Sequence, residues 1–155
     1  MTDNDLPPRY RFGRQFSLLA RQWRNEVYHR LEGAGLTDAT WAPLVHLSAA
    51  GDGITQKELA SLVSIDGSTL VRLLDILSDK GLIERRTDEN DRRAKQVFLT
   101  EAGRAAVAAI RGQLNAVEGE LLGDVTDDEI AVVVDVLSRI GGRLEELREN
   151  RESEE

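Results

Sequence analysis

The sequence predicts a mainly α-helical fold of the α+β class, and three observations lead to this prediction. Long amphipathic helical patterns occupy both ends of the chain, two short helical patterns joined by a tight turn lie between them, and an alternating strand pattern follows the second short helix. The chain has 155 residues, 41% hydrophobic and 31% charged, which suits one domain spanning 1–155.

The first long helix is expected from Arg11 to Glu32, because its apolar residues recur every three or four positions. That stripe consists of Phe12, Phe16, Leu19, Trp23, Val27 and Leu31. A second helix should begin at Thr37 or Asp38 and run to about Ala49. Pro43 should distort it slightly, because a proline beyond the first turn lacks an amide donor and clashes with the preceding turn.

Two short helices joined by a tight turn predict a helix-turn-helix. The segment 55–58, Thr-Gln-Lys-Glu, has the capping-box pattern that begins a helix, and a break follows at Ser64-Ile65. Asp66 or Ser68 can cap the next helix, 68–80, which Gly81 ends. Its leucines at positions 70, 73, 74 and 77 give it one core-facing side.

A hairpin should follow, because two alternating segments, 82–86 and 96–99, flank a loop of turn-forming and charged residues. This predicts a two-stranded wing with a basic tip. Thr100 can cap a long helix after the hairpin, and a second capping box, Thr126 to Glu129, opens a final helix. The tail, 148–155, is expected to fray. The apolar stripes of the terminal helices exceed what a small core can cover, so the two ends should pack on each other or on a second subunit.

The formal net charge of −8 conceals a gradient along the chain. Residues 1–114 carry 16 basic and 15 acidic side chains, whereas residues 115–155 carry 4 and 13. A polyanionic partner would therefore have to meet local basic patches in the first three-quarters of the chain.

Several classes of chemistry are disfavoured by composition. The chain has no cysteine, and its only histidines, His29 and His46, are too far apart for a paired metal motif. No nucleophile–base pair or phosphate-cradling loop is present, so we expect no catalytic residue, no metal site, no cofactor and no enzyme activity. No apolar run is long enough to span a membrane, and the N-terminus lacks an apolar signal core, so a cytoplasmic location is expected.

Each central element has a physical role on a DNA duplex. A helix fits the major groove, and an arginine-tipped hairpin can enter the minor groove. With the leucines inward, the outer N-terminal part of helix 68–80 presents the residues placed to contact bases, namely Ser68, Thr69, Val71 and Arg72. Arg92 and Arg93 suit the minor groove.

The residues of this central region resemble those of the MarR family of bacterial transcriptional regulators, in particular its SlyA-like branch. The matching segments are LVRLLD at 70–75, KGLI at 80–83, DRRAK at 91–95 and VFLTEAG at 97–103. The Asp-x-Arg wing followed by Leu-Thr is the most specific part. The resemblance extends from about Phe12 to Leu147, and includes ARQWR at 20–24 and TW at 40–41.

The resemblance implies a homodimer in which helices from 10–33 and 101–148 interleave, carrying two winged lobes, 37–100, that read a pseudo-palindromic operator in double-stranded DNA. It implies that Arg72 contacts DNA from the recognition helix, that Asp91, Arg92, Arg93 and Lys95 form the DNA-binding wing, and that Asp91 orients an arginine. It also implies a repressor released by a small aromatic carboxylate. The residues near that effector position are Arg21, Trp23, Arg24, Trp41 and His46. The absence of cysteine and of clustered histidines disfavours oxidation and metal sensing.

Other interpretations remain open. Trp23 and Trp41 suit a core or subunit interface better than a ligand wall, and His46 suits a packing role. Arg85 and Arg86 can simply charge a strand edge. The rival function is a winged-helix module that binds protein without specific DNA binding, and the acidic net charge favours it slightly. Salt dependence separates the two, because phosphate contacts weaken steeply with salt.

Overall fold

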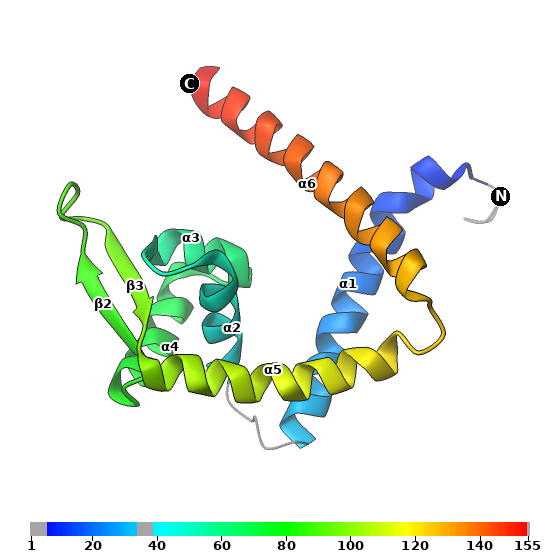
Figure 1. Cartoon of the computed structure of the whole chain (residues 1–155). Helices are drawn as coiled ribbons and strands as arrows, with labels where there is room; N and C mark the ends of the chain where they lie inside the picture. The colour runs from blue at the N-terminus through cyan, green and yellow to red at the C-terminus, as the bar shows by residue number, and fades with distance from the viewer. Residues whose placement is uncertain (1–5, 34–38, 155) are drawn as a thin grey trace. The chain divides into compact units, whose positions relative to one another are not determined.

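The computed structural model describes residues 6–33 and 39–154, and they divide into two compact units between Val117 and Glu118. Within them lie six α-helices and three short strands (Figure 1). The helices are α1 Pro8–Gly33, α2 Trp41–Ala50, α3 Gln56–Val63, α4 Gly67–Asp79, α5 Glu101–Leu121 and α6 Asp127–Glu154, and the strands are β1 Ile54–Thr55, β2 Ile83–Thr87 and β3 Lys95–Leu99. The predicted α+β class, mainly helical, is confirmed.

Helix α2 begins later than expected, at Trp41 with Thr40 as its N-cap residue, and the proposed caps Thr37 and Asp38 lie outside the described residues. Pro43 therefore falls in the first turn, where a backbone amide has no intrahelical acceptor to lose. Because α2 starts later than expected, Pro43 is not expected to distort it, and α2 continues as a helix to Ala50.

Helices α3 and α4 form the predicted helix-turn-helix. The capping box that starts α3 is present: the Thr55 hydroxyl accepts the Glu58 amide at 3.1 Å, and the Glu58 carboxylate accepts the Thr55 amide at 2.7 Å. Ser64 ends α3 in the left-handed conformation, with φ 60°, and Asp66 then caps α4. The sharp turn between the two helices is thus made by Ser64, in the break predicted from the sequence.

The sheet has three antiparallel strands in the order β1-β3-β2, so the prediction of a two-stranded wing was incomplete. Strand β2 pairs with β3 along its full length, from Ile83 opposite Leu99 to Thr87 opposite Lys95. The two-residue β1 joins the other edge of β3, with Ile54 opposite Val97. A strand this short has no alternation to detect, and its Thr55 also serves as the cap of α3.

The core of the first unit is made of the inward sides of α2, α3, α4 and the sheet, extended by the end of α1 and the first half of α5. Its most buried side chains are Leu31, Leu47, Leu59, Leu70, Leu74, Leu77 and Val97, each at most 1% exposed. The α5 residues that join it, Val107, Ile110 and Leu114, recur at helical spacing. The leucine face predicted for α4 is therefore its buried face.

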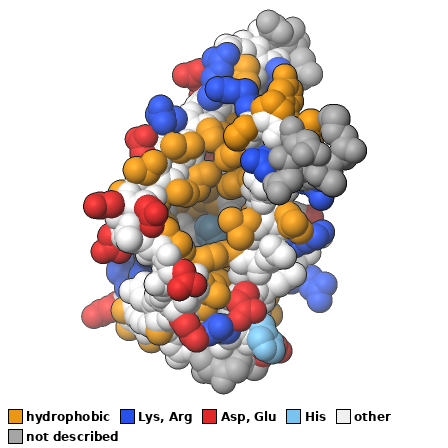
Figure 2. Space-filling model, turned by 90° about the vertical axis from the view of Figure 1, so that its right-hand side faces the viewer, with side chains coloured by type: hydrophobic (Ala, Val, Ile, Leu, Met, Phe, Trp, Pro, Cys, Tyr) orange, Lys and Arg blue, Asp and Glu red, His pale blue; other side chains and the backbone are white. Residues whose placement is uncertain are grey.

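Apolar side chains outside this core remain exposed on α1 and α6. Phe16 is 45% exposed on α1, and Val134 and Leu144 are 56% and 63% exposed on α6. In the view of Figure 2, hydrophobic side chains are exposed at the surface between charged ones. No helix among residues 6–33 and 39–154 has the length and apolarity needed to cross a membrane.

The described part of the tail that was expected to fray is helical, because α6 continues through Glu154. Ion pairs at helical spacing support this last part of α6: Arg143 pairs with Glu146 at 2.9 Å, and Arg148 lies 3.6 Å from Glu145. Such pairs each add a few tenths of a kcal/mol to an exposed helix, roughly 0.2–0.5 kcal/mol. Composition alone suggested a loose tail, but the spacing of its charges favours helix.

Candidate nucleic-acid interface

The start of α4 is organised by the carboxylate of Asp66. It accepts the Thr69 amide at 2.8 Å, the Thr69 hydroxyl at 2.7 Å and the Ser68 hydroxyl at 2.5 Å. These hydrogen bonds hold the pKa of Asp66 far below its usual value, and those from the side chains of Ser68 and Thr69 contribute most. Both hydroxyl protons are thereby used, so Ser68 and Thr69 present their oxygens outward mainly as acceptors.

The outer face of α4 carries one cation without a counterion. Val71 and Arg72 are exposed, while Leu70 and Leu74 on the opposite face are fully buried. Within the described part of the chain, the Arg72 guanidinium has neither an ion pair nor a hydrogen bond. Its five donors are therefore available to a partner outside the chain.

An ion pair connects the wing to α4. Arg85 of β2 donates to the Asp75 carboxylate of α4 at 2.7 Å. Its neighbour Arg86 pairs with Glu84 at 2.9 Å and lies over the ring of Phe98, 4.4 Å from the ring centroid. Both arginines thus have specific partners within the lobe, which goes beyond the role of charging a strand edge.

The wing tip is a turn closed by its own carboxylates. Asp91 accepts the backbone amide of Arg93 at 2.9 Å, and Asp88 accepts that of Asn90 at 2.8 Å. The side chains of Arg92 and Arg93 are exposed, and neither forms an ion pair with any residue that the structure describes. Asp91 therefore shapes the backbone turn that carries Arg93, and its role in orienting an arginine stays a prediction.

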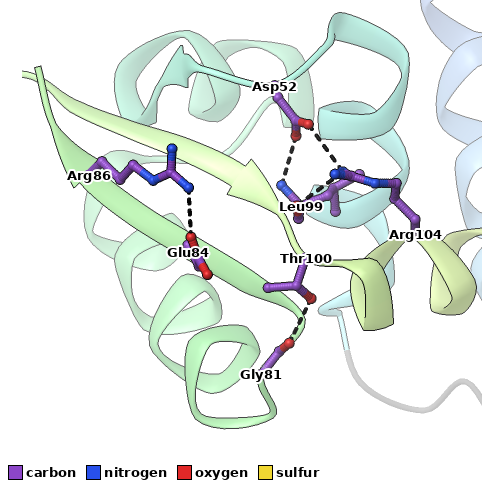
Figure 3. Close-up of polar contacts among 7 residues, drawn as sticks. All are labelled: Asp52, Gly81, Glu84, Arg86, Leu99, Thr100 and Arg104. Carbon is purple, nitrogen blue, oxygen red and sulfur yellow. Dashed lines mark hydrogen bonds and ion pairs between the residues drawn. The ribbon is translucent and has the colours of Figure 1, made fainter.

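The wing also has a firm junction with α5 (Figure 3). The Thr100 hydroxyl donates to the Gly81 carbonyl at 2.7 Å and accepts the Gly103 amide at 3.0 Å, so Thr100 caps α5 as predicted. Asp52, in the turn before β1, accepts the Leu99 amide at 2.7 Å and pairs with Arg104 at 3.1 Å. No local pattern predicts the Asp52 contacts, because their partners lie 47 and 52 residues away.

Of the five residues predicted to lie near an effector, three share one neighbourhood where α1 meets α2. Trp41 is buried and its ring lies 4.9 Å from that of Tyr28, a residue that the sequence pattern did not indicate. Partial burial lowers the pKa of the His46 imidazole, and the positive charge of Arg24 lowers it further. Burial raises the pKa of Tyr28, and Arg24 opposes that change.

The other two effector candidates differ in position. Arg21 lies three residues before Arg24 and so shares its helix face, whereas Trp23 continues the stripe of the buried Val27 and Leu31. For metals, no group of three or more histidine, cysteine, aspartate or glutamate residues that could hold an ion occurs among the described residues.

Both the sequence and the fold of this chain are similar to those of known proteins. A sequence model of the MarR family matches residues 34–94. The crystal structure of the transcriptional regulator PA3341 is 38% identical, with a TM-score of 0.72 over 87% of this chain and 98% of that chain. A structure of MarR is 28% identical, with a TM-score of 0.70 over 96% and 97% of the two chains.

A further similar structure is a cysteine-to-serine mutant of MarR from E. coli complexed with operator DNA. It is 29% identical, with a TM-score of 0.62 over 83% of this chain and 91% of that chain. Assignment to the SlyA-like branch remains a prediction. The family and these structural neighbours are regulators and not enzymes, and this chain belongs to the MarR family of transcriptional regulators.

Proposed function

We propose that the protein is a dimeric regulator that binds a specific DNA sequence through α4 and the wing. One observation carries the proposal: Arg72 on α4 and Arg92 and Arg93 on the wing are exposed cations of one lobe, and none has a counterion among the described residues. In a chain of net charge −8, such unpaired arginines point to an anionic partner.

The proposed base contacts follow from the donors and acceptors of α4. Arg72 supplies donors that suit guanine O6 and N7 in the major groove, and Val71 can contact a thymine methyl group. Ser68 and Thr69, whose protons are bound to Asp66, supply acceptors for the amino groups of cytosine or adenine. Arg92 and Arg93 would lie in the adjacent minor groove, with Lys95 and the turn at Asp91 supporting them.

The proposed dimer would cover the apolar residues left exposed on α1 and α6. Phe16, Leu19 and Val134 are each between 45% and 62% exposed, which is unfavourable in water for residues of this size. A second copy of the chain offers the same residues in return, as a two-fold interface requires. Sedimentation equilibrium at micromolar concentration should show a species of twice 17.2 kDa, and a monomer alone would contradict the dimer.

We further propose that the regulator is a repressor released by a small aromatic carboxylate bound near Arg24, Trp41 and His46. Arg24 has no carboxylate partner in the described chain, and it lies close enough to His46 to lower the pKa of that imidazole. A carboxylate would neutralise this charge while its ring packs on the aromatic pair Tyr28–Trp41. Release of DNA requires that the ligand bind the DNA-free conformation better, by a few kcal/mol.

The decisive experiment is selection of bound duplexes from a random-sequence library at 50 and 200 mM salt. The proposed function predicts enrichment of an inverted repeat with half-sites about one helical turn apart, roughly 10 base pairs. It also predicts that binding weakens by orders of magnitude between the two salt concentrations. Failure to retain any duplex at 50 mM salt would favour the rival, a winged-helix module that binds protein.

A further inference from the structure

A cleft separates the beginning of α3 from the wing. Gln56 and Lys57 line it from α3, and Asp91, Arg93 and Lys95 line it from the wing turn and the start of β3. Its volume is about 360 Å³, which is ample for a phosphate group with its water shell. The sequence predicts the wing residues as DNA contacts, whereas it places Lys57 only within a capping box.

The cleft is more positive than the chain as a whole. Three cations and one carboxylate line it, whereas the chain carries a net charge of −8. The Asp91 carboxylate accepts the Arg93 backbone amide at 2.9 Å, and among the described residues the Lys95 ammonium donates to the neutral hydroxyl of Thr87, at 3.2 Å. Lys57 has no hydrogen bond or ion pair with any described residue. Among the described residues that line the cleft, the single carboxylate of Asp91 therefore compensates only part of the positive charge of the three cations.

The neighbouring carboxylate of Glu58 is not among the residues that line the cleft. It accepts both the amide and the hydroxyl of Thr55, at 2.7 and 2.9 Å, and so is engaged in starting α3. Lys57 and Lys95 thus line the same cleft from two different elements, and neither forms an ion pair with a described carboxylate. Two ammonium groups on a single concave surface suit an oxyanion that has several acceptor atoms.

We infer that this cleft holds a phosphate of the DNA backbone, with Lys57 and Lys95 as its contacts. This inference rests on the proposed function, because in a helix-turn-helix the first helix crosses the backbone while the second enters the groove. The cleft joins that first helix, α3, to the wing, so a phosphate bound there would fix both elements against one strand. Its role is to position the duplex, and it carries no sequence preference.

The test is the salt dependence of binding to a fluorescent 30-base-pair duplex of mixed sequence, measured for the full chain. Lys57→Gln should reduce the slope of log K against log salt by about 0.9, the value for one phosphate contact. The weakening between 50 and 200 mM salt should accordingly be about 3.5-fold smaller than in the wild type. Arg111→Gln is the matched control, because it removes one exposed cation about 15 Å along α5 from the wing and should leave the slope unchanged.

A second measurement is the ¹⁵N spectrum of lysine ammonium groups, in which the Lys57 and Lys95 signals should shift when the duplex is added. An unchanged slope and an unshifted Lys57 signal, in a protein whose Arg92→Ala variant does lose affinity, would overturn the inference and leave the proposed function intact. If the wild type binds no duplex, both fail. Titration with inorganic phosphate completes the test: saturation at millimolar concentration without duplex binding would assign the cleft to a free phosphate compound and overturn the DNA assignment.

Discussion

The carboxylate of Asp52 and the guanidinium of Arg104 lie 3.1 Å apart and enclose the end of β3 between them. Asp52 accepts the Leu99 amide at 2.7 Å, and Arg104 donates to the Leu99 carbonyl at 3.0 Å. The pair therefore satisfies both backbone groups of the residue at which the wing sheet passes into α5. It connects the turn before β1 to the first turns of α5, and so ties the wing sheet to the helix that follows it.

Asp52→Ala should destabilise the first unit by about 1–2 kcal/mol. The substitution leaves the Leu99 amide without its acceptor and removes the ion pair, and the value is discounted because Asp52 and Arg104 are 38% and 58% exposed. Asp52→Asn retains an acceptor for the amide and should be less destabilising. Urea unfolding followed by circular dichroism measures both, and equal destabilisation by the two variants would show that the hydrogen bond to Leu99 contributes little.

Gly103→Ala should destabilise the fold much more than an ordinary substitution in a helix. A Cβ at this position would lie 2.0 Å from the Leu82 carbonyl oxygen, so α5 would have to move away from the wing sheet. Gly112 on the same helix is the matched control, because its added Cβ would meet nothing within 4 Å. Gly112→Ala should raise stability by about 0.5–1 kcal/mol through helix propensity. Thermal melts of the two variants that shift in the same direction would contradict the close approach.

The parts of this structure that follow from local chemistry could be predicted from sequence. The capping boxes at Thr55 and Thr126 are present as predicted, because each is closed by residues only three positions apart. The buried face of α4 likewise follows from the spacing of its leucines. By contrast, β1 has two residues and exists only because β3 offers an edge to pair with.

The interactions that organise the candidate site could not be predicted from local sequence patterns, because their partners meet only in the folded structure. Arg85 and Asp75 are ten residues apart and meet only once β2 packs beside α4. Tyr28 lies outside the apolar stripe of α1, and its packing on Trp41 depends on how α2 crosses it. The exposure of Arg72, Arg92 and Arg93 could be predicted from the sequence, because the outer face of a helix and the tip of a hairpin can be located without knowing the tertiary structure.

Asp91→Ala should weaken DNA binding although it removes a negative charge from the wing. The carboxylate holds the Arg93 amide at 2.9 Å, so its removal should loosen the turn that presents Arg92 and Arg93. Asp91→Asn retains the acceptor while removing the charge, and should bind DNA at least as tightly as the wild type. Anisotropy titrations at 150 mM salt distinguish the two variants. Tighter binding by Asp91→Ala would show that this residue is only an unfavourable charge.

Substitutions in α4 and in the wing should change DNA binding in different ways. Arg72→Ala should cost about 1–3 kcal/mol on the selected operator and relax preference at one or two positions of each half-site. Arg92→Ala and Arg93→Ala should weaken binding to specific and random duplexes alike and reduce the salt slope by about one for each phosphate that is no longer bound. Competition between the two duplex types measures this difference. Reduced operator preference in the wing variants would require the wing to read bases directly.

Binding of an aromatic carboxylate near His46 should tighten as the pH falls from 8 towards 6. Partial burial and the charge of Arg24 lower the pKa of His46 below its usual 6.5, so the imidazole is neutral at pH 7. A bound carboxylate favours the imidazolium and so raises the pKa of His46, which means that binding takes up a proton. Between high and low pH, the affinity should therefore increase about tenfold for each unit by which the ligand raises this pKa.

The measurement for this last effect is calorimetric titration with benzoate in buffers of different ionisation enthalpy. His46→Gln should abolish the proton uptake, whereas His29→Gln, which changes an exposed histidine of α1, should preserve it. In the ligand-free protein, the lowered pKa of His46 makes stability depend on pH. As the pH drops, the unfolded chain takes up the proton before the folded protein does, so the free energy of unfolding falls below about pH 6.5. Benzoate affinity that is independent of pH, or unchanged in His46→Gln, would place any carboxylate site away from His46.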